Sequence, residues 1–220
     1  MIAPMLTAPS DVGGYDPYRD AGDCEFDPIE ASDRLRFFQL AIKRFELQQW
    51  QKDIVTTLFG WKRPDGTRRY REAFIFVPRK NGKSSLAAGL ALCGLFCDRE
   101  PRGQFFCAAG DLDQADLVFS MASGMIQESP ALGKKCKVLA SRKRIVKGDS
   151  WLRAIPADDK GAYGTEPHFV VGDELHTWPN RRLKDVLHTG TVPRPQPLEL
   201  YITTAGYNFL TICGEVYTHA

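Results

Sequence analysis

The amino-acid sequence predicts an α/β fold in which a mainly parallel β-sheet is flanked by helices. Between residues 73 and 127, two hydrophobic strand-like segments each precede a helix-like segment. Connections in this order are almost always right-handed crossovers onto a parallel sheet. Two later hydrophobic segments, at 168–176 and within 193–206, are predicted to add core strands.

Size and composition indicate one large soluble domain. The chain has 220 residues, of which 43% are hydrophobic and 25% charged, as in ordinary globular proteins. No apolar run approaches the ~20 residues of a membrane span, and residues 1–10 lack the basic region of a signal peptide. Six cysteines without metal-finger spacing indicate a reduced cytoplasmic setting, and the four histidines form no zinc motif. No membrane partner is expected.

Charge is distributed unevenly along the chain. Residues 1–33 hold eight acids and one arginine, a balance of −7, so the remainder carries +9 within a total of +2. A basic body suits a polyanionic partner, although a mixed solvated surface fits equally well. Residues 1–33 are also rich in Pro, Gly and Asp, which predicts an extended or partly ordered arm.

Two helices are predicted before the first core strand. Ser32 or Asp33 is a suitable cap for a helix from about 34 to 45. The segment 45–62 has apolar residues at three- and four-residue spacing, which predicts an amphipathic helix that ends at Gly60.

The segment 73–97 predicts a phosphate-binding loop. Residues 74–77 form a strand, 78–82 a tight polar loop, and a largely apolar helix opens at Lys83. Backbone N–H groups at a helix N-terminus form an anion cradle that Gly82 allows the phosphates to approach. In the motif G-x-x-x-x-G-K-[ST], the lysine reaches the β- and γ-phosphates and the hydroxyl, here Ser84, binds magnesium.

One position departs from the strict motif, because Val77 stands where the first glycine belongs. The alternative is a Gly-Lys-Ser sequence in an ordinary loop, but the strand before it and the helix after it favour the nucleotide site. Arg79 and Lys80 add positive charge beside a triphosphate, and Arg79 is a candidate arginine finger in cis or a paired surface cation. Asn81 supplies turn geometry or, with Ser85, a contact to the nucleotide.

The predicted strand at 104–109 and helix at 111–127 are followed by a segment of different character. Residues 134–155 predict short strands joined by charged turns, as a small β-hairpin insertion or meander. Eight basic residues against one acid between 134 and 153 predict either contact with nucleic-acid phosphates or a solvated hairpin. A further helix is predicted at 180–190.

An acidic pair ends the hydrophobic strand about 90 residues after the loop. Asp173 is predicted to hold Mg²⁺, and Glu174 to orient and deprotonate the water that attacks the γ-phosphate. An apolar strand that ends in two acids is a weak signal alone. Together with the phosphate loop it predicts ATP hydrolysis rather than binding only.

Two weaker sets of polar residues complete the predicted site. Glutamines 48, 49 and 51 precede the loop, and Gln51 is the candidate for pairing with the adenine edge, although helical glutamines are usually solvated. Thr203 and Thr204 end a core strand, where ligands gather in parallel sheets. Their hydroxyls either sense the γ-phosphate or merely belong to a strand and turn.

With these residues collected, the chain resembles the ATPase domain of the large terminase subunit of tailed bacteriophages. The resemblance spans about residues 45–208 and rests on five stretches in the family's order: LQQWQKDIVTTLFGWK, YREAFIFVPRKNGKSSLAAGLAL, FCAAGDLDQADLVF, HFVVGDELH and RPQPLELYITTAG. A glycine-poor loop is typical of that family, which accounts for the valine at the first glycine position.

The resemblance implies a P-loop NTPase of the additional-strand, catalytic-glutamate type at 34–220, and ATP hydrolysis that moves double-stranded DNA into a procapsid. It assigns adenine to Gln51, phosphate and metal roles to Arg79, Lys83 and Ser84, and metal and water activation to Asp173 and Glu174. Thr203 and Thr204 fall on the motif that couples hydrolysis to DNA movement.

The family also implies partners and a place in the cell. These are the portal protein, the small terminase subunit, other copies of the chain in a ring, and the host cell cytoplasm. A neighbour in such a ring can donate an arginine, with Arg142, Arg144 and Arg194 as candidates. The family's nuclease domain is not expected here, because the chain stops at Ala220. Alternatives are a helicase-like ATPase and a non-catalytic docking module with a vestigial nucleotide fold.

Overall fold

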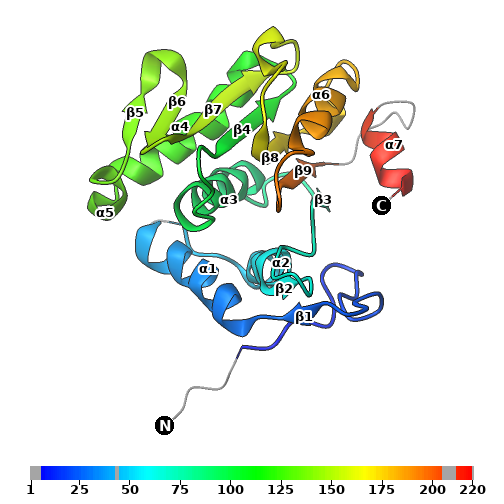
Figure 1. Cartoon of the computed structure of the whole chain (residues 1–220). Coiled ribbons are helices and arrows are strands. Elements are labelled where there is room, and N and C mark those ends of the chain that lie inside the picture. The colour runs from blue at the N-terminus through cyan, green and yellow to red at the C-terminus, as the bar shows by residue number, and fades with distance from the viewer. Residues whose placement is uncertain (1–5, 43–44, 205–211, 220) are drawn as a thin grey trace. The chain divides into compact units, whose positions relative to one another are not determined.

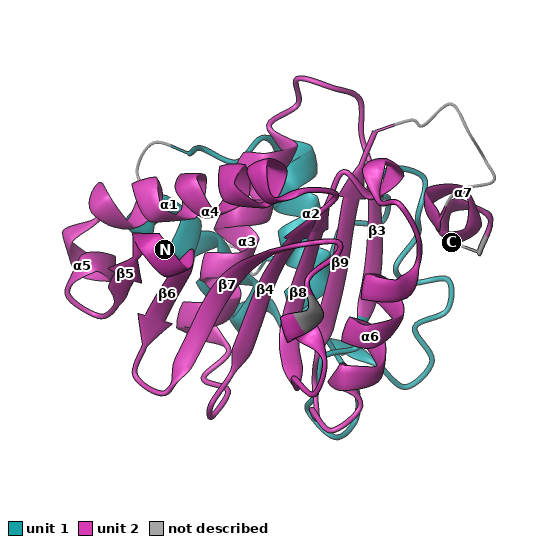
Figure 2. Ribbon diagram, turned by 90° about the horizontal axis from the view of Figure 1, so that it is seen from above, with its two compact units in different colours: residues 1–71 teal, residues 72–220 magenta. Residues whose placement is uncertain are grey.

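The computed structural model describes residues 6–42, 45–204 and 212–219. The chain divides into two compact units, Met1–Arg71 and Glu72–Ala220 (Figure 2). In the described residues, no helix is long and apolar enough to cross a membrane.

The first unit is built on two helices, α1 (Pro28–Ala41) and α2 (Gln49–Gly60). Two short antiparallel strands, β1 (Glu25–Phe26) and β2 (Trp61–Lys62), flank them. The α2 helix ends at Gly60, as predicted. A side chain at Gly60 would lie 2.3 Å from the Phe26 ring, so close packing requires glycine there.

The first helix corrects the predicted start at residue 34. The Asp27 carboxylate accepts hydrogen bonds from the backbone N–H groups of Ile29 (2.9 Å) and Glu30 (3.0 Å). Pro28 at the first helical position has the backbone angle that a helix needs and lacks only an N–H that would be unpaired anyway. The predicted cap at Ser32 or Asp33 is therefore wrong, because a better cap lies upstream and those residues are helical.

The second unit contains a seven-stranded sheet of order β3-β9-β8-β4-β7-β6-β5 (Figure 1). Five strands run parallel, and β6 and β5 are antiparallel at one edge. The strands have these bounds: β3 (Glu72–Phe76), β4 (Gln104–Ala109), β5 (Lys137–Leu139), β6 (Arg144–Lys147), β7 (Ser150–Pro156), β8 (Pro167–Asp173) and β9 (Leu198–Thr203). The predicted mainly parallel α/β fold is confirmed.

The segment 134–155 forms a meander, but the structure does not set it apart as an insertion. Its last strand, β7, pairs with β4 in parallel register, so the meander is one edge of the main sheet. Leu152 and Ile155 of β7 are fully buried. Burial of these side chains favours joining the central sheet over a separate hairpin.

Helices cover both faces of this sheet: α3 (Lys83–Cys97), α4 (Leu112–Gln127), α5 (Pro130–Gly133), α6 (Arg182–Thr191) and α7 (Ile212–His219). A side chain at Gly94 of α3 would collide with Phe105 and Phe169 on one face. Leu183 and Leu187 of α6 share a core with other strand residues on the opposite face. Figures 1 and 2 show α3 and α6 on opposite sides. Strands buried on both faces are typical of parallel sheets.

The strand order brings three segments that are distant in sequence together at the carboxyl ends of neighbouring strands. Strand β9 pairs with both β3 and β8, with Phe76 opposite Thr203 and Asp173 opposite Ile202. Since the strands are parallel, their carboxyl ends meet there. The loop after β3, the acids after β8 and the threonines after β9 are therefore neighbours.

Candidate active site

The loop between β3 and α3 is shaped by two residues in the left-handed backbone conformation. Lys80 has φ 68° and Gly82 has φ 70°. The Val77 backbone N–H donates to the Thr203 carbonyl (3.1 Å), so this position still belongs to the strand ladder. A β-branched residue suits an extended position, which explains why valine stands where the strict motif has glycine. The turn itself begins after Val77.

The Asn81 side chain stabilises the loop from inside. Its amide Nδ2 donates to the carbonyls of Pro78 (3.1 Å) and Arg79 (3.4 Å). These bonds are the turn-geometry role that the sequence left open for Asn81.

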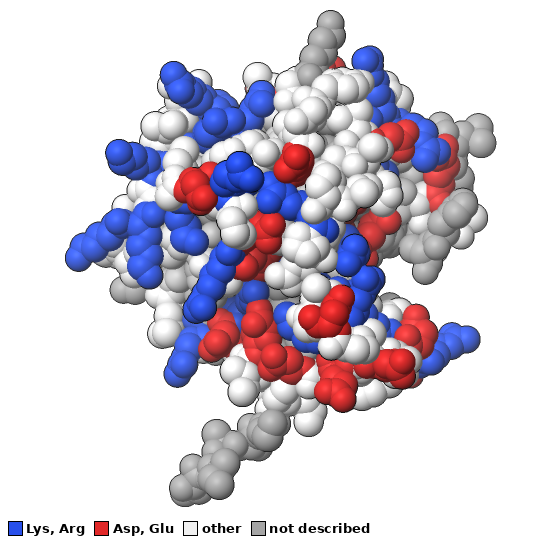
Figure 3. Space-filling view, viewed as in Figure 1, with Lys and Arg blue, Asp and Glu red and all other residues white. Residues whose placement is uncertain are grey.

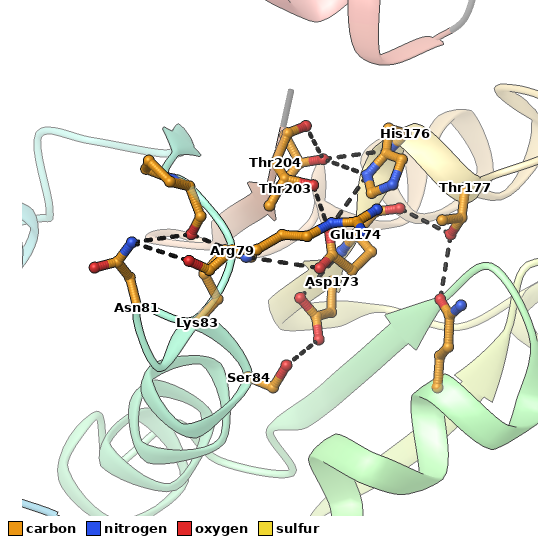
Figure 4. Close-up of polar contacts among 12 residues, drawn as sticks. Arg79, Asn81, Lys83, Ser84, Asp173, Glu174, His176, Thr177, Thr203 and Thr204 are labelled. Atoms are coloured by element: carbon orange, nitrogen blue, oxygen red, sulfur yellow. Dashed lines mark hydrogen bonds and ion pairs between the residues drawn. The ribbon is translucent and has the colours of Figure 1, made fainter. Parts of the chain in front are cut away.

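The first residues of α3 contact the acids at the end of β8 (Figure 4). The Ser84 hydroxyl donates to Asp173 Oδ2 at 2.8 Å. The Lys83 ammonium lies 3.7 Å from Glu174 Oε1 and donates to the Pro78 carbonyl at 3.4 Å. Lys83 is buried, with 6% of its surface exposed. The fold therefore brings the predicted phosphate and acidic motifs to one place.

The two acids point in different directions because the chain turns sharply between them. Glu174 has φ 47°, a conformation that is uncommon outside glycine and often found at functional sites. Its N–H donates to the Ile202 carbonyl (2.8 Å) and to Asp173 Oδ1 (3.0 Å). Asp173 thus faces Ser84, while Glu174 faces Lys83.

The Asp173 carboxylate is almost completely removed from solvent. Burial raises its pKa above the ordinary value, and repulsion from Glu174 acts in the same direction. The hydrogen bond from Ser84 and the charge of Lys83 oppose this rise. A buried carboxylate with few compensating partners is a site where a cation is electrostatically favoured.

The predicted threonines lie beside the acid, at the end of β9. Thr203 and Thr204 are both buried. The Thr204 hydroxyl donates to Glu174 Oε2 at 3.4 Å. The Thr203 hydroxyl bonds to a residue that the sequence interpretation missed.

That residue is His176, in the short 3₁₀ turn η3 (Leu175–Thr177). Its Nδ1 lies 3.0 Å from the Thr203 hydroxyl and 3.2 Å from Glu174 Oε2. His176 stands two positions after Glu174, and a continuing strand would not have folded it back toward the carboxylate. The left-handed turn at Glu174 does so.

Of the remaining predicted residues of the loop region, one extends toward this cluster and two do not. The Arg79 side chain extends from the loop in the direction of Glu174 (Figure 4). Lys80 is exposed. Ser85 faces helix α4, where its hydroxyl lies 3.6 Å from the Met121 sulfur. The structure thus shows Ser85 in a packing contact.

Gln51 belongs to the first unit, on α2. It is 2% exposed, whereas Gln48 and Gln49 are exposed. Its Oε1 accepts a hydrogen bond from the Gln48 backbone N–H at 2.9 Å, as part of the cap of α2. The amide is therefore held in one orientation.

The three candidate arginines have different surroundings. The Arg194 guanidinium donates to Glu100 (3.0 Å) and to backbone carbonyls just before β4 and β8. It therefore lies at the amino-terminal ends of these strands, away from the acids. Its donors are used, so Arg194 is not available to a neighbouring site. Arg142 is exposed, and the Arg144 guanidinium stacks 4.4 Å from the Trp151 ring centre.

A parallel sheet with a Gly-Lys-Ser loop at the start of a helix, facing an Asp-Glu pair on a nearby strand, defines a phosphate-loop nucleotide-binding protein. Residues 49–220 match the family model described as terminase large subunit, ATPase domain. The chain belongs to this family, and the resemblance noted in the sequence is confirmed.

Individual relatives agree with the family match. The large terminase subunit of Enterobacteria phage HK97 is 27% identical over 167 residues, which are 74% of this chain and 32% of that protein. This chain therefore spans about a third of that relative.

Solved structures show the same fold. The crystal structure of the HK97 large terminase matches with a TM-score of 0.76 and 24% identity, over 86% of this chain and 41% of that one. The ATPase domain of the Thermus phage P74-26 large terminase matches with a TM-score of 0.59 and 20% identity, over 79% of this chain and 70% of that one.

Proposed function

We propose that this chain hydrolyses ATP and that hydrolysis drives double-stranded DNA into a viral procapsid. The observation that carries the proposal is the convergence of Ser84 on Asp173 and of Lys83 on Glu174, from segments about 90 residues apart. Family membership supports the same reaction. A module without catalysis would not require a second acid beside the loop lysine.

The donors at the loop suit a magnesium–triphosphate substrate. Ser84 and Asp173 would hold Mg²⁺, since this ion prefers oxygen ligands and usually takes one or two from protein and the others from phosphates and water. The ion supplies positive charge that offsets the negative charge of the phosphates. Lys83, Arg79 and Lys80 would bind the phosphates, with the amides around Gly82.

Glu174 is placed to act as the general base. Its carboxylate has two neighbours besides Lys83, the Thr204 hydroxyl and the His176 ring. If the Lys83 ammonium moved to a phosphate, Thr204 and His176 would still hold the Glu174 carboxylate in position to orient a water molecule. The position of β9 between β3 and β8 supports the additional-strand, catalytic-glutamate type.

For adenine recognition we propose Gln51. Its Oε1 is engaged in the cap of α2, so its two amide N–H groups are the donors that would pair with a ring nitrogen of adenine. The capped, fixed orientation lowers the entropy cost of that contact.

For DNA contact, the eight basic residues of the meander divide into two groups. Four have internal partners. Lys143 pairs with Asp116 and Arg153 with Asp159, Lys147 donates to the Leu95 carbonyl at the end of α3, and Arg144 stacks on Trp151. The other four are exposed, without an ion-pair partner in the described part of the chain: Lys134, Lys135, Lys137 and Arg142.

Figure 3 shows Lys and Arg side chains gathered on this side of the second unit, where β5, β6 and α5 lie in Figure 1. We propose that the four exposed residues contact the phosphate backbone of DNA. The portal protein, the small terminase subunit, further copies in a ring and the host cytoplasm complete the proposed setting, through family membership.

The proposal is tested by ATP turnover of this chain with and without double-stranded DNA, beside Lys83→Ala. We expect turnover by the parent chain that DNA stimulates, and loss of both ATP binding and turnover in Lys83→Ala. Equal turnover by the two proteins would refute the assignment of the site. Turnover that ignores DNA would refute the motor role while leaving the ATPase.

A further inference from the structure

The Glu174 carboxylate is bounded by three groups from three separate segments of the chain. Lys83 of α3 lies 3.7 Å from Oε1, while Oε2 is 3.4 Å from the Thr204 hydroxyl and 3.2 Å from His176 Nδ1. Only Lys83 has an expected partner in the substrate. The contacts that remain after nucleotide binding are therefore those to Thr204 and His176.

The hydrogen bonds around Thr203 determine which nitrogen of His176 carries a proton. The Thr203 hydroxyl donates to the Thr204 carbonyl (3.2 Å) and accepts from the His176 backbone N–H (3.4 Å). Its proton is used, so toward the imidazole it is an acceptor. The Glu174 carboxylate is also an acceptor. Two acceptors facing Nδ1 require a proton on Nδ1, with one N–H shared between them.

Packing of the turn does not explain the position of the ring. Leu175 and Trp178, on either side, are buried and anchor η3 in the core shared with α6. The His176 side chain is 19% exposed and lies at the edge of the site. Its polar contacts, rather than apolar burial, therefore set its orientation (Figure 4).

We propose that His176 is the positioning residue for Glu174. Its Nδ1–H holds the carboxylate and the Thr203 hydroxyl together, which sets the orientation of the base from the end of β9. The inference rests on the proposed ATPase function, because it assigns His176 a part in turnover through Glu174. It adds a connection between the base and the end of β9, where Thr203 lies.

The first test separates binding from turnover. In His176→Ala we expect kcat for ATP to fall by about tenfold or more, since misplacement of a reacting group by ~1 Å can cost 10²-fold, while the KM and Kd for ATP stay near those of the parent. His176→Asn should recover most of the loss, because its amide N–H can occupy the place of Nδ1–H. Unchanged kcat in His176→Ala, or Asn no better than Ala, would overturn the proposal.

Two controls interpret this result. His188→Ala removes another histidine whose Nδ1 pairs with a glutamate, Glu199, at 2.7 Å near the start of β9, and it should turn over ATP like the parent. Glu174→Gln measures the full loss of the base. If Glu174→Gln keeps parent-like turnover, the proposed function fails, whatever His176 does.

A second measurement does not depend on activity. The ¹⁵N chemical shifts of a histidine-labelled chain report the tautomer of each neutral ring. We expect His176 to be protonated at Nδ1 and its shift to change in Thr203→Val. Protonation at Nε2 in the parent chain would overturn the proposal, even if turnover fell in His176→Ala.

Discussion

Replacement of Glu174 by glutamine separates the proposed chemistry from the architecture of the site. Glutamine keeps an oxygen that can accept from His176 and Thr204, but it cannot take a proton from water. A positioned general base contributes about 10²–10⁴-fold, which is about 2.7–5.4 kcal/mol of activation free energy. We therefore expect turnover to fall by that factor.

The same substitution should change stability only slightly. It removes an ion pair of 3.7 Å between a buried lysine and a glutamate that is 26% exposed. An exposed pair contributes about 0.2–1 kcal/mol and a buried charge left unpaired costs about 3–5 kcal/mol. Because Lys83 keeps the Pro78 carbonyl as a partner, we expect a loss of about 1 kcal/mol. For a chain of this size the melting temperature then falls by no more than about 2–4 °C. A large kinetic loss with a small stability loss is the signature of a catalytic group.

The assay combines single-turnover phosphate release with equilibrium ATP binding. Glu166→Gln is the matched control, because Glu166 immediately precedes β8, is exposed and lies at the opposite end of the strand from Glu174. ATP binding should be retained or tightened in Glu174→Gln, since a negative charge near the phosphates is removed. Parent-like turnover, or a loss explained entirely by weaker binding, would refute the reasoning.

Three further predictions concern packing, charge and DNA. Gly172→Ala would place its Cβ 2.6 Å from the Tyr201 ring and should cost about 1–3 kcal/mol of unfolding free energy, whereas Gly124→Ala in open space on α4 should stabilise by about 0.5–1 kcal/mol in the same denaturant titration. Burial raises the pKa of Asp173, so metal-free stability should fall as pH rises from the ordinary carboxyl range through that raised pKa. Asp173→Asn should remove this dependence and raise the metal-free melting temperature, and an unchanged pH profile would contradict it. Glutamine substitutions at the four exposed basic residues Lys134, Lys135, Lys137 and Arg142 should weaken DNA binding. The slope of the logarithm of the binding constant against the logarithm of salt concentration should flatten by about 0.9 for each lost phosphate contact. Arg153→Gln, at a residue with an internal partner, should leave this slope unchanged.

The parts of the fold that were predicted from sequence are those encoded locally. The loop segment has a strand before it and a helix after it, and the acidic pair ends an apolar run. In a parallel sheet the loop and the acids both follow the carboxyl ends of strands, so the approach of Ser84 to Asp173 followed from topology. The boundaries of β4 and the end of α2 were equally local.

Other features depended on competition between possible helix caps or on tertiary contacts. Asp27 followed by proline is a stronger helix start than Ser32, but it was hidden in an acidic, proline-rich segment. The role of β7 depended on burial against β4, which a short charged meander does not reveal. His176 reaches the carboxylate only because Glu174 adopts a left-handed conformation, and residue spacing carries no sign of such a turn.

Strand β9, which lies between β3 and β8, also sets the distance between the phosphate loop and the acids. Neighbouring strands are about 4.8 Å apart, so β3 and β8, with β9 between them, are separated by about twice that spacing. Main-chain hydrogen bonds, not side chains, fix this gap, so it tolerates substitution on either flank. The separation of the two motifs is thus a property of the backbone, and Thr203 ends the strand that defines it, with Thr204 directly after.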